Sequence, residues 1–220
     1  MAVTSAVAKL WLEKTGCPIC EGYGLSETSP SASCNPTNSK AFTGTIGVPI
    51  PGTWFKLLDD DGNEVAPGQP GEIAIKGPQV MAGYWQRPDE TAKVMTPDGY
   101  FKSGDIGVID ENGFFKIVDR KKDMILVSGF NVYPNEIEEV VSRLDGVLEC
   151  ASVGVPDEAT GEAVKLVIVR KTPDLTEARI REYCRANFTG YKQPKVIEFR
   201  SELPKTPVGK VLRRELRDKK

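Results

Sequence analysis

The most informative stretch of the sequence is DGYFKSGDIG at residues 98–107, which is followed by KIVDRKK at residues 116–122. Residues 107–110 and 114–118 are rich in strand-forming side chains, and a Glu-Asn-Gly run between them is typical of a tight turn. The two runs are therefore predicted to form a β-hairpin. Just after it, Asp-Arg-Lys-Lys-Asp at residues 119–123 is the most linker-like point of the chain.

The pattern upstream of the hairpin is also β. Residues 55–58 and 71–76 are predicted strands, with a turn around Asp61 and Gly62 between them. Because several short strands alternate here with Gly and Pro, residues 43–118 are predicted to form a small β-barrel-like subdomain, either a small barrel or a curled sheet.

The first 42 residues have a different character. Val3, Val7 and Leu10 recur at helical spacing, and Gly16 follows as a helix stop. A short strand is predicted at residues 18–21. One helix and one strand cannot cover a parallel sheet, so this segment is interpreted as the end of an α/β domain, and residues 1–118 as the C-terminal remnant of a larger domain.

Beyond the linker, helices alternate with strands. Residues 137, 140, 141 and 144 form one apolar helical face, and Thr176 is the predicted N-cap of a helix that ends at Asn187. The strands are predicted at residues 151–155, 163–170 and 195–199. The predicted fold class is thus α+β with several subdomains, the last of which is a small α+β domain that follows the linker.

Composition excludes several classes of function. A net charge of −2 over 220 residues gives no reason to expect nucleic-acid binding. The absence of histidine removes every Ser-His or Cys-His nucleophile scheme. Cys17 and Cys20 form a CxxC, but no second pair completes a zinc site, and an odd cysteine count favours a reducing cytoplasm. No apolar run is long enough to cross a bilayer.

Four segments contain side chains suited to a nucleotide or phosphate ligand. In EGYGLSET at residues 21–28, glycines permit close approach of a ligand, Tyr23 offers a flat face and Glu27 a hard oxygen for Mg²⁺. Asp105 follows a glycine turn, where a carboxylate can accept hydrogen bonds from a ribose diol. SGFNV at residues 128–132 is a small-residue loop, and LPKTPVGK at residues 203–210 places a lysine on a Gly/Pro-rich loop.

These four segments, in this order, resemble the acyl-adenylate-forming (AMP-binding) enzymes, and the resemblance covers the whole chain. Residues 98–122 and the run YGLSETSP at residues 23–30 look like the bacterial long-chain fatty acid–CoA ligases. Taken singly, Glu27 and Asp105 also fit capping or turn residues, Lys210 an exposed lysine, and residues 119–120 a surface ion pair. The shared order of the motifs favours the ligand-binding interpretation.

The resemblance implies a role for each matching residue. Tyr23 would stack on adenine, Glu27 would hold Mg²⁺, Asp119 would be the hinge, and Lys210 would bridge the carboxylate and the α-phosphate. The resemblance also implies that residues 119–122 are a hinge and residues 123–220 a mobile C-terminal α+β lid domain. The residues implied in nucleotide binding are Tyr23, Gly24, Ser26, Asp105, Ile117 and Arg120. Those implied in the CoA tunnel are Ser128, Gly129 and Phe130.

The implied reaction has two steps, in which a carboxylate attacks ATP to give acyl-AMP and the thiol of coenzyme A then displaces AMP. The expected cofactors are ATP/AMP, Mg²⁺ and coenzyme A, and the expected substrate is a fatty acid. The family's Ser/Thr/Gly-rich phosphate loop has no match before Tyr23. We therefore expect a truncated chain that lacks the N-terminal region of the same enzyme and is inactive alone.

Two alternatives remain open on the sequence. The same chemistry could act on an aryl or medium-chain acid, or the chain could be a non-catalytic polypeptide that only binds nucleotide, coenzyme A or a partner. A cytoplasmic location is expected, and the basic residues 213–220 could contact lipid peripherally at the inner face of the membrane.

Overall fold

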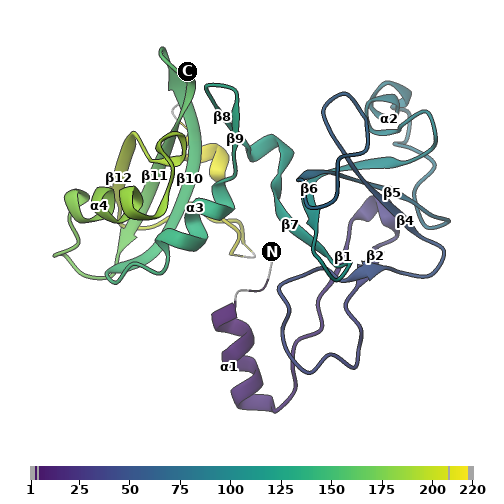
Figure 1. Ribbon diagram of the computed structural model, residues 1–220, viewed down its shortest axis with the longest axis horizontal. Helices are drawn as coiled ribbons and strands as arrows, with labels where there is room; N and C mark the ends of the chain where they lie inside the picture. The colour runs from purple at the N-terminus through teal and green to yellow at the C-terminus, as the bar shows by residue number, and fades with distance from the viewer. Residues whose placement is uncertain (1–2, 4, 208, 218–220) are drawn as a thin grey trace. The chain divides into compact units, whose positions relative to one another are not determined.

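The computed structural model describes residue 3, residues 5–207 and residues 209–217 (Figure 1). The chain divides into two compact units, the first of which ends at Lys121 and the second of which begins at Lys122. Each unit has its own buried apolar cluster, so each is described by itself.

The first unit begins with α1 (Ser5–Thr15), and Gly16 follows with a φ of +70°. This confirms the predicted helix and its stop. The strand predicted at residues 18–21 is wrong, because the first strand begins only at Gly22, which is paired with Cys34. Before it, Asn35 donates its N–H to the carbonyl of Glu21. The resulting sheet contains β1 (Gly22–Gly24), β2 (Ser31–Cys34) and β3 (Val48–Pro49).

The rest of the first unit is built on a four-stranded antiparallel sheet. In spatial order its strands are β4 (Trp54–Leu58), β5 (Gly71–Lys76), β6 (Phe101–Ile109) and β7 (Phe115–Arg120). The predicted hairpin is confirmed by the pairing of β6 with β7, whose turn contains Gly113 at a φ of +82°. The short helix α2 (Pro88–Val94) precedes β6.

Of the two predicted forms, the closed barrel is wrong, because among the described residues this sheet stays open. The edge of β7 that faces away from β6 pairs with a loop. Ile46 donates its N–H to the Phe115 carbonyl at 2.8 Å, and Phe115 donates its N–H to the Gly47 carbonyl at 2.9 Å. Gly47 lets the same loop pass close to β2, because a Cβ there would lie 2.1 Å from the Cys34 carbonyl carbon. The loop, and not β4, therefore covers this part of the β7 edge.

The core of the first unit joins its two sheets. Ala32 from the small sheet packs with four side chains of the larger one, Leu57, Ile73, Ile75 and Phe115. Phe55 meets Phe115 edge to face at 5.1 Å between ring centroids and Tyr23 at 6.5 Å. Aromatic packing of this kind fixes where Tyr23 stands relative to the larger sheet.

The second unit is an α+β domain, as predicted. Its strands are β8 (Ile125–Val127), β9 (Phe130–Val132), β10 (Val147–Asp157), β11 (Gly161–Arg170) and β12 (Val196–Arg200). The long hairpin β10–β11 forms its centre, β12 joins β11 in parallel, and β8 meets β11 at Gly161. Four short 3₁₀ turns complete the two units: Ser26–Thr28, Lys121–Asp123, Gly190–Lys192 and Arg213–Glu215.

The two helices of the second unit cover one face of its sheet. They are α3 (Pro134–Val141) and α4 (Glu177–Asn187), and Thr176 caps α4 by accepting a hydrogen bond from the Arg179 N–H, as predicted. Their apolar side chains lie in the core, where Ile137 and Ile180 are fully buried. On another part of the sheet, Leu203 and Leu216 of the C-terminal segment pack against β10 and β11 side chains. The C-terminal segment is thereby held to the domain at both ends of its loop.

Candidate functional site

A three-residue cluster in the first unit brings Tyr23 to Asp105, which lies 82 positions further along the chain, and to Arg120. Tyr23 donates its hydroxyl to Asp105 Oδ2 at 2.7 Å, and Arg120 Nε lies 3.7 Å from Asp105 Oδ1. Asp105 and Arg120 are direct partners in the β6–β7 ladder, so strand register brings them together. The side chains of two predicted nucleotide-binding residues, Tyr23 and Arg120, therefore converge on the carboxylate of a third, Asp105.

The electrostatics of this cluster keep Tyr23 protonated. Burial raises the pKa of Tyr23 above its ordinary value, and the neighbouring Asp105 carboxylate raises it further. Tyr23 consequently keeps its proton at neutral pH and acts as a donor. The side chain of Asp105 is 13% exposed, whereas that of Arg120 is 45% exposed, so the anion lies in the more sheltered place.

The turn before Asp105 depends on Gly104. Its φ is +75°, a region that favours glycine, and no heavy atom lies within 4 Å of the position of an added Cβ. Conformation, and not crowding, is therefore the reason for this glycine. Ser103 Oγ accepts a hydrogen bond from the Asp105 N–H at 3.1 Å, which fixes the direction in which the strand continues.

Gly24 has a structural explanation that does not involve a ligand. A Cβ at this position would lie 1.7 Å from the Pro30 carbonyl oxygen. The buried Thr28 ties the loop down, because its Oγ1 accepts from the Leu25 N–H and donates to the Pro30 carbonyl. Ser26 is left exposed on the 3₁₀ turn that follows β1.

Glu27 is placed by a loop that the sequence analysis did not single out. Tyr84 donates its hydroxyl to Glu27 Oε1 at 2.9 Å, and Met81 donates its N–H to the Glu27 carbonyl at 2.9 Å. Burial raises the pKa of Tyr84, and the hydrogen bond to Glu27 adds to the effect, so this tyrosine also stays protonated. Only the Gly-Tyr-Trp run at residues 83–85 could have drawn attention to it.

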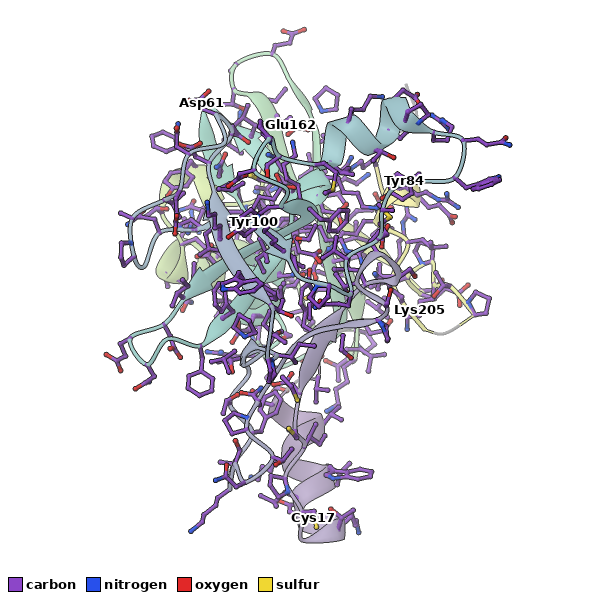
Figure 2. All side chains as sticks on the ribbon, turned by 90° about the vertical axis from the view of Figure 1, so that its right-hand side faces the viewer. Cys17, Asp61, Tyr84, Tyr100, Glu162 and Lys205 are labelled. Carbon is purple, nitrogen blue, oxygen red and sulfur yellow. The ribbon has the colours of Figure 1, made fainter. Side chains whose placement is uncertain are left out.

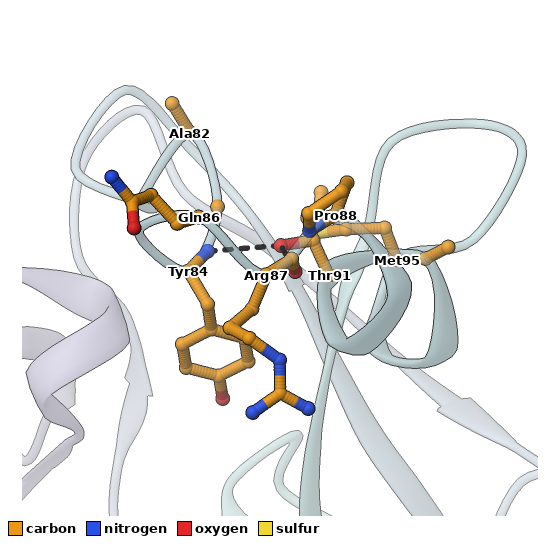
Figure 3. Close-up of a pocket in the computed structure, with 9 residues that line it drawn as sticks. Ala82, Tyr84, Gln86, Arg87, Pro88, Thr91 and Met95 are labelled. Atoms are coloured by element: carbon orange, nitrogen blue, oxygen red, sulfur yellow. Dashed lines mark hydrogen bonds between the residues drawn. The ribbon is translucent and has the colours of Figure 1, made fainter.

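The same loop lines an open pocket of about 480 Å³ beside α2 (Figure 3). Thr91 of α2 holds the loop, since its Oγ1 accepts from the Tyr84 N–H at 2.9 Å and donates to the Arg87 carbonyl. Arg87 pairs with Asp89 and Glu90 at the start of α2. Figure 3 shows the ring of Tyr84 projecting from this loop.

Ile117 and Asp119 are inward-facing residues of β7. Ile117 packs against the core of the first unit, on the strand that also carries Arg120. Asp119 is 1% exposed, stands opposite Ile106 in the ladder and accepts a hydrogen bond from the Arg120 N–H at 2.7 Å. Asp119 is therefore an integral part of the sheet.

In the second unit, Ser128 and Gly129 form the turn of the β8–β9 hairpin. Their φ values are +51° and +83°, as a two-residue hairpin turn requires. Ser128 donates its N–H to the Thr160 carbonyl at 2.9 Å. Phe130 is 55% exposed, and its ring stacks on that of Tyr191 at 4.7 Å between centroids. Ser128 and Tyr191 also line a pocket of about 260 Å³.

Lys210 lies on a closed loop of the second unit. Thr206 donates its N–H to the Lys210 carbonyl at 2.8 Å, and Lys210 donates its N–H to Thr206 Oγ1 at 3.1 Å. Lys205 and Val211 form a β-bridge across the base of the loop, and Lys205 pairs with Glu149 of β10. Val208, within the predicted motif, lies outside the described residues.

The CxxC pair does not form a metal site in the described part of the chain. Cys17 stands exposed at the end of α1 (Figure 2), and Cys20 Sγ lies 3.8 Å from Cys34 Sγ. Nowhere in the described ranges do three or more His, Cys, Asp or Glu side chains group in a way that could hold a metal ion. None of the described helices is long and apolar enough to cross a membrane.

Comparison with protein families places this geometry in a known class. Residues 1–85 match the model of the AMP-binding enzymes, and residues 136–210 match that of the AMP-binding enzyme C-terminal domain. Together the two matches span most of the chain in the order that the sequence analysis expected. The chain belongs to the AMP-binding enzyme family.

Within this family the chain is similar to long-chain-fatty-acid–CoA ligases. It is 59% identical to that of Escherichia coli O6:H1 over 218 residues, which are 99% of this chain and 39% of the relative. It is also 39% identical to a feruloyl-CoA synthase of Amycolatopsis, over 98% of this chain and 44% of that protein. The chain thus spans less than half the length of the curated relatives that it matches.

A solved structure supports the fold. The ATP-bound MatB of Rhodopseudomonas palustris is 37% identical, with a TM-score of 0.90 over 96% of this chain and 42% of that one. The predicted α+β class and the predicted resemblance are both confirmed. The individual roles assigned to the site residues remain predictions.

Proposed function

We propose that this chain supplies the ribose-binding site and the lid of an AMP-forming long-chain fatty acid–CoA ligase. The observation that carries the proposal is the convergence of Tyr23 and Arg120 on Asp105, in a chain 59% identical to such a ligase. In this role Asp105 would accept hydrogen bonds from the ribose hydroxyls of ATP and acyl-AMP. Hydrogen bonds to a charged group contribute about 1.5–3 kcal/mol each.

The neighbours of Asp105 would prepare it for this task. Tyr23 occupies Oδ2, and Arg120 balances the charge from 3.7 Å without closing over the carboxylate. A preorganised acceptor avoids the cost of reorganisation when the nucleotide binds. The ring of Tyr23 would stack on adenine, Ser26 would reach a phosphate, and Arg120 would assist at the ribose and the phosphate.

Glu27 fits a single contact to Mg²⁺. Its carboxylate is half-buried and receives one hydrogen bond, to Oε1, from Tyr84, and Mg²⁺ in phosphate-transfer enzymes commonly takes one or two carboxylates together with substrate oxygens. When bound, the ion would neutralise charge that gathers on the phosphates during adenylation. Glu27 would orient that ion, and Tyr84 would orient Glu27.

The second unit would act in turn on the two steps. Lys210, on its closed loop, would bridge the carboxylate and the α-phosphate during adenylation. The Ser128–Gly129 turn, with Phe130 beside it, would line the path of coenzyme A during thioester formation. If the lid brings only one of these loops to the nucleotide at a time, adenylation and thioester formation need different arrangements of the lid. A domain rotation would then separate the two steps.

The pivot of this rotation is best placed just after Lys121. Asp119 is buried in the β7 ladder, and Lys121 pairs with Asp60 of the first unit at 2.8 Å. On the other side, Asp123 pairs with Arg213 of the second unit at 3.5 Å. The pivot would therefore fall at Lys122, between these two anchored residues and within the predicted range 119–122.

The identity of the acid is a further proposal. The 59% identity to a fatty acid ligase favours a long-chain fatty acid, while the 39% identity to a feruloyl-CoA synthase favours an aryl acid as the second candidate. Lipid contact through the basic tail has less support, because Arg213 and Arg217 both pair with Asp123. The cytoplasmic location stays a prediction.

The test uses the 220-residue chain in two forms: alone, and joined in frame behind the part of the Escherichia coli ligase that precedes the matching region (the fused enzyme). Each form receives ATP, Mg²⁺ and coenzyme A with either oleate or ferulate, and acyl-CoA and AMP are measured by mass spectrometry. We expect oleoyl-CoA and AMP in equal amounts from the fused enzyme and none from the chain alone. Preference for ferulate would replace the fatty acid proposal with the aryl one.

A further inference from the structure

Glu72 is a buried carboxylate that no role described so far explains. It lies on β5, its side chain is 8% exposed, and both of its oxygens are engaged. Oε1 accepts a hydrogen bond from the Gly104 N–H at 3.1 Å, and Oε2 accepts one from Lys121 Nζ at 3.0 Å. A buried carboxylate without partners would be strongly unfavourable, so the two hydrogen bonds are what allow Glu72 to be buried here.

The two partners of Glu72 flank the proposed ribose site. Gly104 is the residue immediately before Asp105, and Lys121 is the residue immediately after Arg120. Since Asp105 and Arg120 are paired in the β6–β7 ladder, one carboxylate holds both strands at the point where the cluster is built. The first unit also ends at Lys121, so the same carboxylate holds the last residue before the proposed pivot.

Asp60 gives Lys121 a second partner of a different quality. Lys121 Nζ lies 2.8 Å from Asp60 Oδ1, but the side chain of Asp60 is 76% exposed. Exposed ion pairs contribute little, so Glu72 is the partner that fixes Lys121. Burial by itself would lower the pKa of Lys121, but the hydrogen bonds to Asp60 and Glu72 outweigh it and raise the pKa, so the lysine stays charged.

We propose that Glu72 is a positioning residue that locks the Asp105 turn and the start of the hinge to β5 through its bonds to Gly104 and Lys121. Its role at the ribose rests on the function proposed above, whereas its hold on Lys121 does not. Through this lock, the first unit presents a fixed Asp105 to the nucleotide and a fixed Lys121 to the pivot. Motion is thereby confined to the residues that follow Lys121.

Four substitutions separate the two arms of the lock. Glu72→Gln keeps one acceptor for the Gly104 N–H but loses the anion that pairs with Lys121. Lys121→Met removes only the hinge arm, Lys121→Arg preserves it, and Glu72→Leu removes both arms. Lys56→Met is the matched control, because Lys56 forms an exposed pair with Asp98, 3.0 Å away, in the same unit.

The experiment is amide hydrogen exchange, followed by mass spectrometry on the intact 220-residue chain. We expect Glu72→Gln and Lys121→Met to speed exchange about tenfold at residues 121–124, the change expected from losing one charge-assisted bond. Lys121→Arg and Lys56→Met should exchange like the parent there. Glu72→Leu should add faster exchange at Gly104.

Two results would overturn the proposal: unchanged exchange at residues 121–124 in both Glu72→Gln and Lys121→Met, or a uniform rise across the first unit, which would indicate a merely structural role. The same measurement on the fused enzyme, with AMP present, keeps the proposed function separate. If AMP fails to slow exchange around Asp105 in the parent but the pattern among the variants holds, the ribose role fails and the lock on Lys121 stands.

Discussion

The two units hold their proposed functional residues in different ways. In the first, Tyr23, Asp105 and Arg120 project from paired strands and contact one another through their side chains. In the second, Ser128 and Lys210 lie on turns whose backbone bonds fix the loop. A site on strands is suited to binding the same nucleotide throughout, and loops are suited to delivering groups to it one at a time.

The largest expected effect, and the one that tests this difference between the units most strongly, is that of a substitution at Lys210. In the fused enzyme, Lys210→Ala should slow adenylation by about 10²–10³-fold, because a charge that stabilises the transition state is lost, while thioester formation from supplied oleoyl-AMP is spared. The two half-reactions are timed separately. The matched control is Lys205→Ala on the same loop, which should leave adenylation nearly unchanged, and equal loss of both half-reactions in Lys210→Ala would refute the division of labour.

A large but purely structural effect is expected at Ile137, which would show that the units have separate cores. Ile137 is fully buried in the second unit, so Ile137→Ala should lower the free energy of unfolding of that unit by about 2–5 kcal/mol. Amide exchange should rise in β11 and stay as in the parent in β5. Equal increases in both strands would mean that the two units unfold together.

A moderate effect is expected at Tyr84, which sharpens the placement of Glu27. Tyr84→Phe removes the hydroxyl that donates to Glu27 Oε1, so the fused enzyme should need several-fold more Mg²⁺ for half-maximal adenylation. Tyr100→Phe is the control, since the ring of Tyr100 lies under Lys56 instead. An unchanged Mg²⁺ requirement in Tyr84→Phe would remove Tyr84 from the site.

The smallest effect concerns the pH dependence of the second unit. A hydrogen bond from Lys195, reinforced by Thr160, lowers the pKa of Asp157 to about 2. Because the folded value lies below the ordinary one near 3.9, this carboxylate stabilises the fold above about pH 4 and loses its contribution as the pH falls towards 2. Melting curves at pH 5 and pH 3 should therefore differ slightly less for Asp157→Asn than for the parent.

The sequence predicted local structure well where the signal itself is local. Thr176 as an N-cap and the turn at Gly113 are set by a few neighbouring residues, and both were found. A closed barrel is not found in the part of the chain that the structure describes, because closure depends on whether the edge strands β4 and β7 pair with each other. The pairing of Phe115 with residues 46 and 47 depends on a loop whose sequence carries no strand pattern.

The proposed site shows the same limit. Motif order singled out Tyr23, Asp105 and Arg120, although nothing local shows that the Tyr23 hydroxyl reaches the Asp105 carboxylate. Tyr84 and Glu72 were missed because each acts across a long sequence separation on a residue that the motifs do contain. Side chains of this kind carry no pattern of their own and become visible only when the strands are placed.

The most direct test of the account is the affinity of AMP for the fused enzyme, measured by calorimetry for the parent and for Asp105→Asn. If Asp105 binds the ribose hydroxyls, the variant should bind AMP about 10–100-fold more weakly, because its neutral amide offers a single, uncharged acceptor. Equal affinity in a variant that melts like the parent would contradict the assignment of the ribose site to the Tyr23–Asp105–Arg120 cluster.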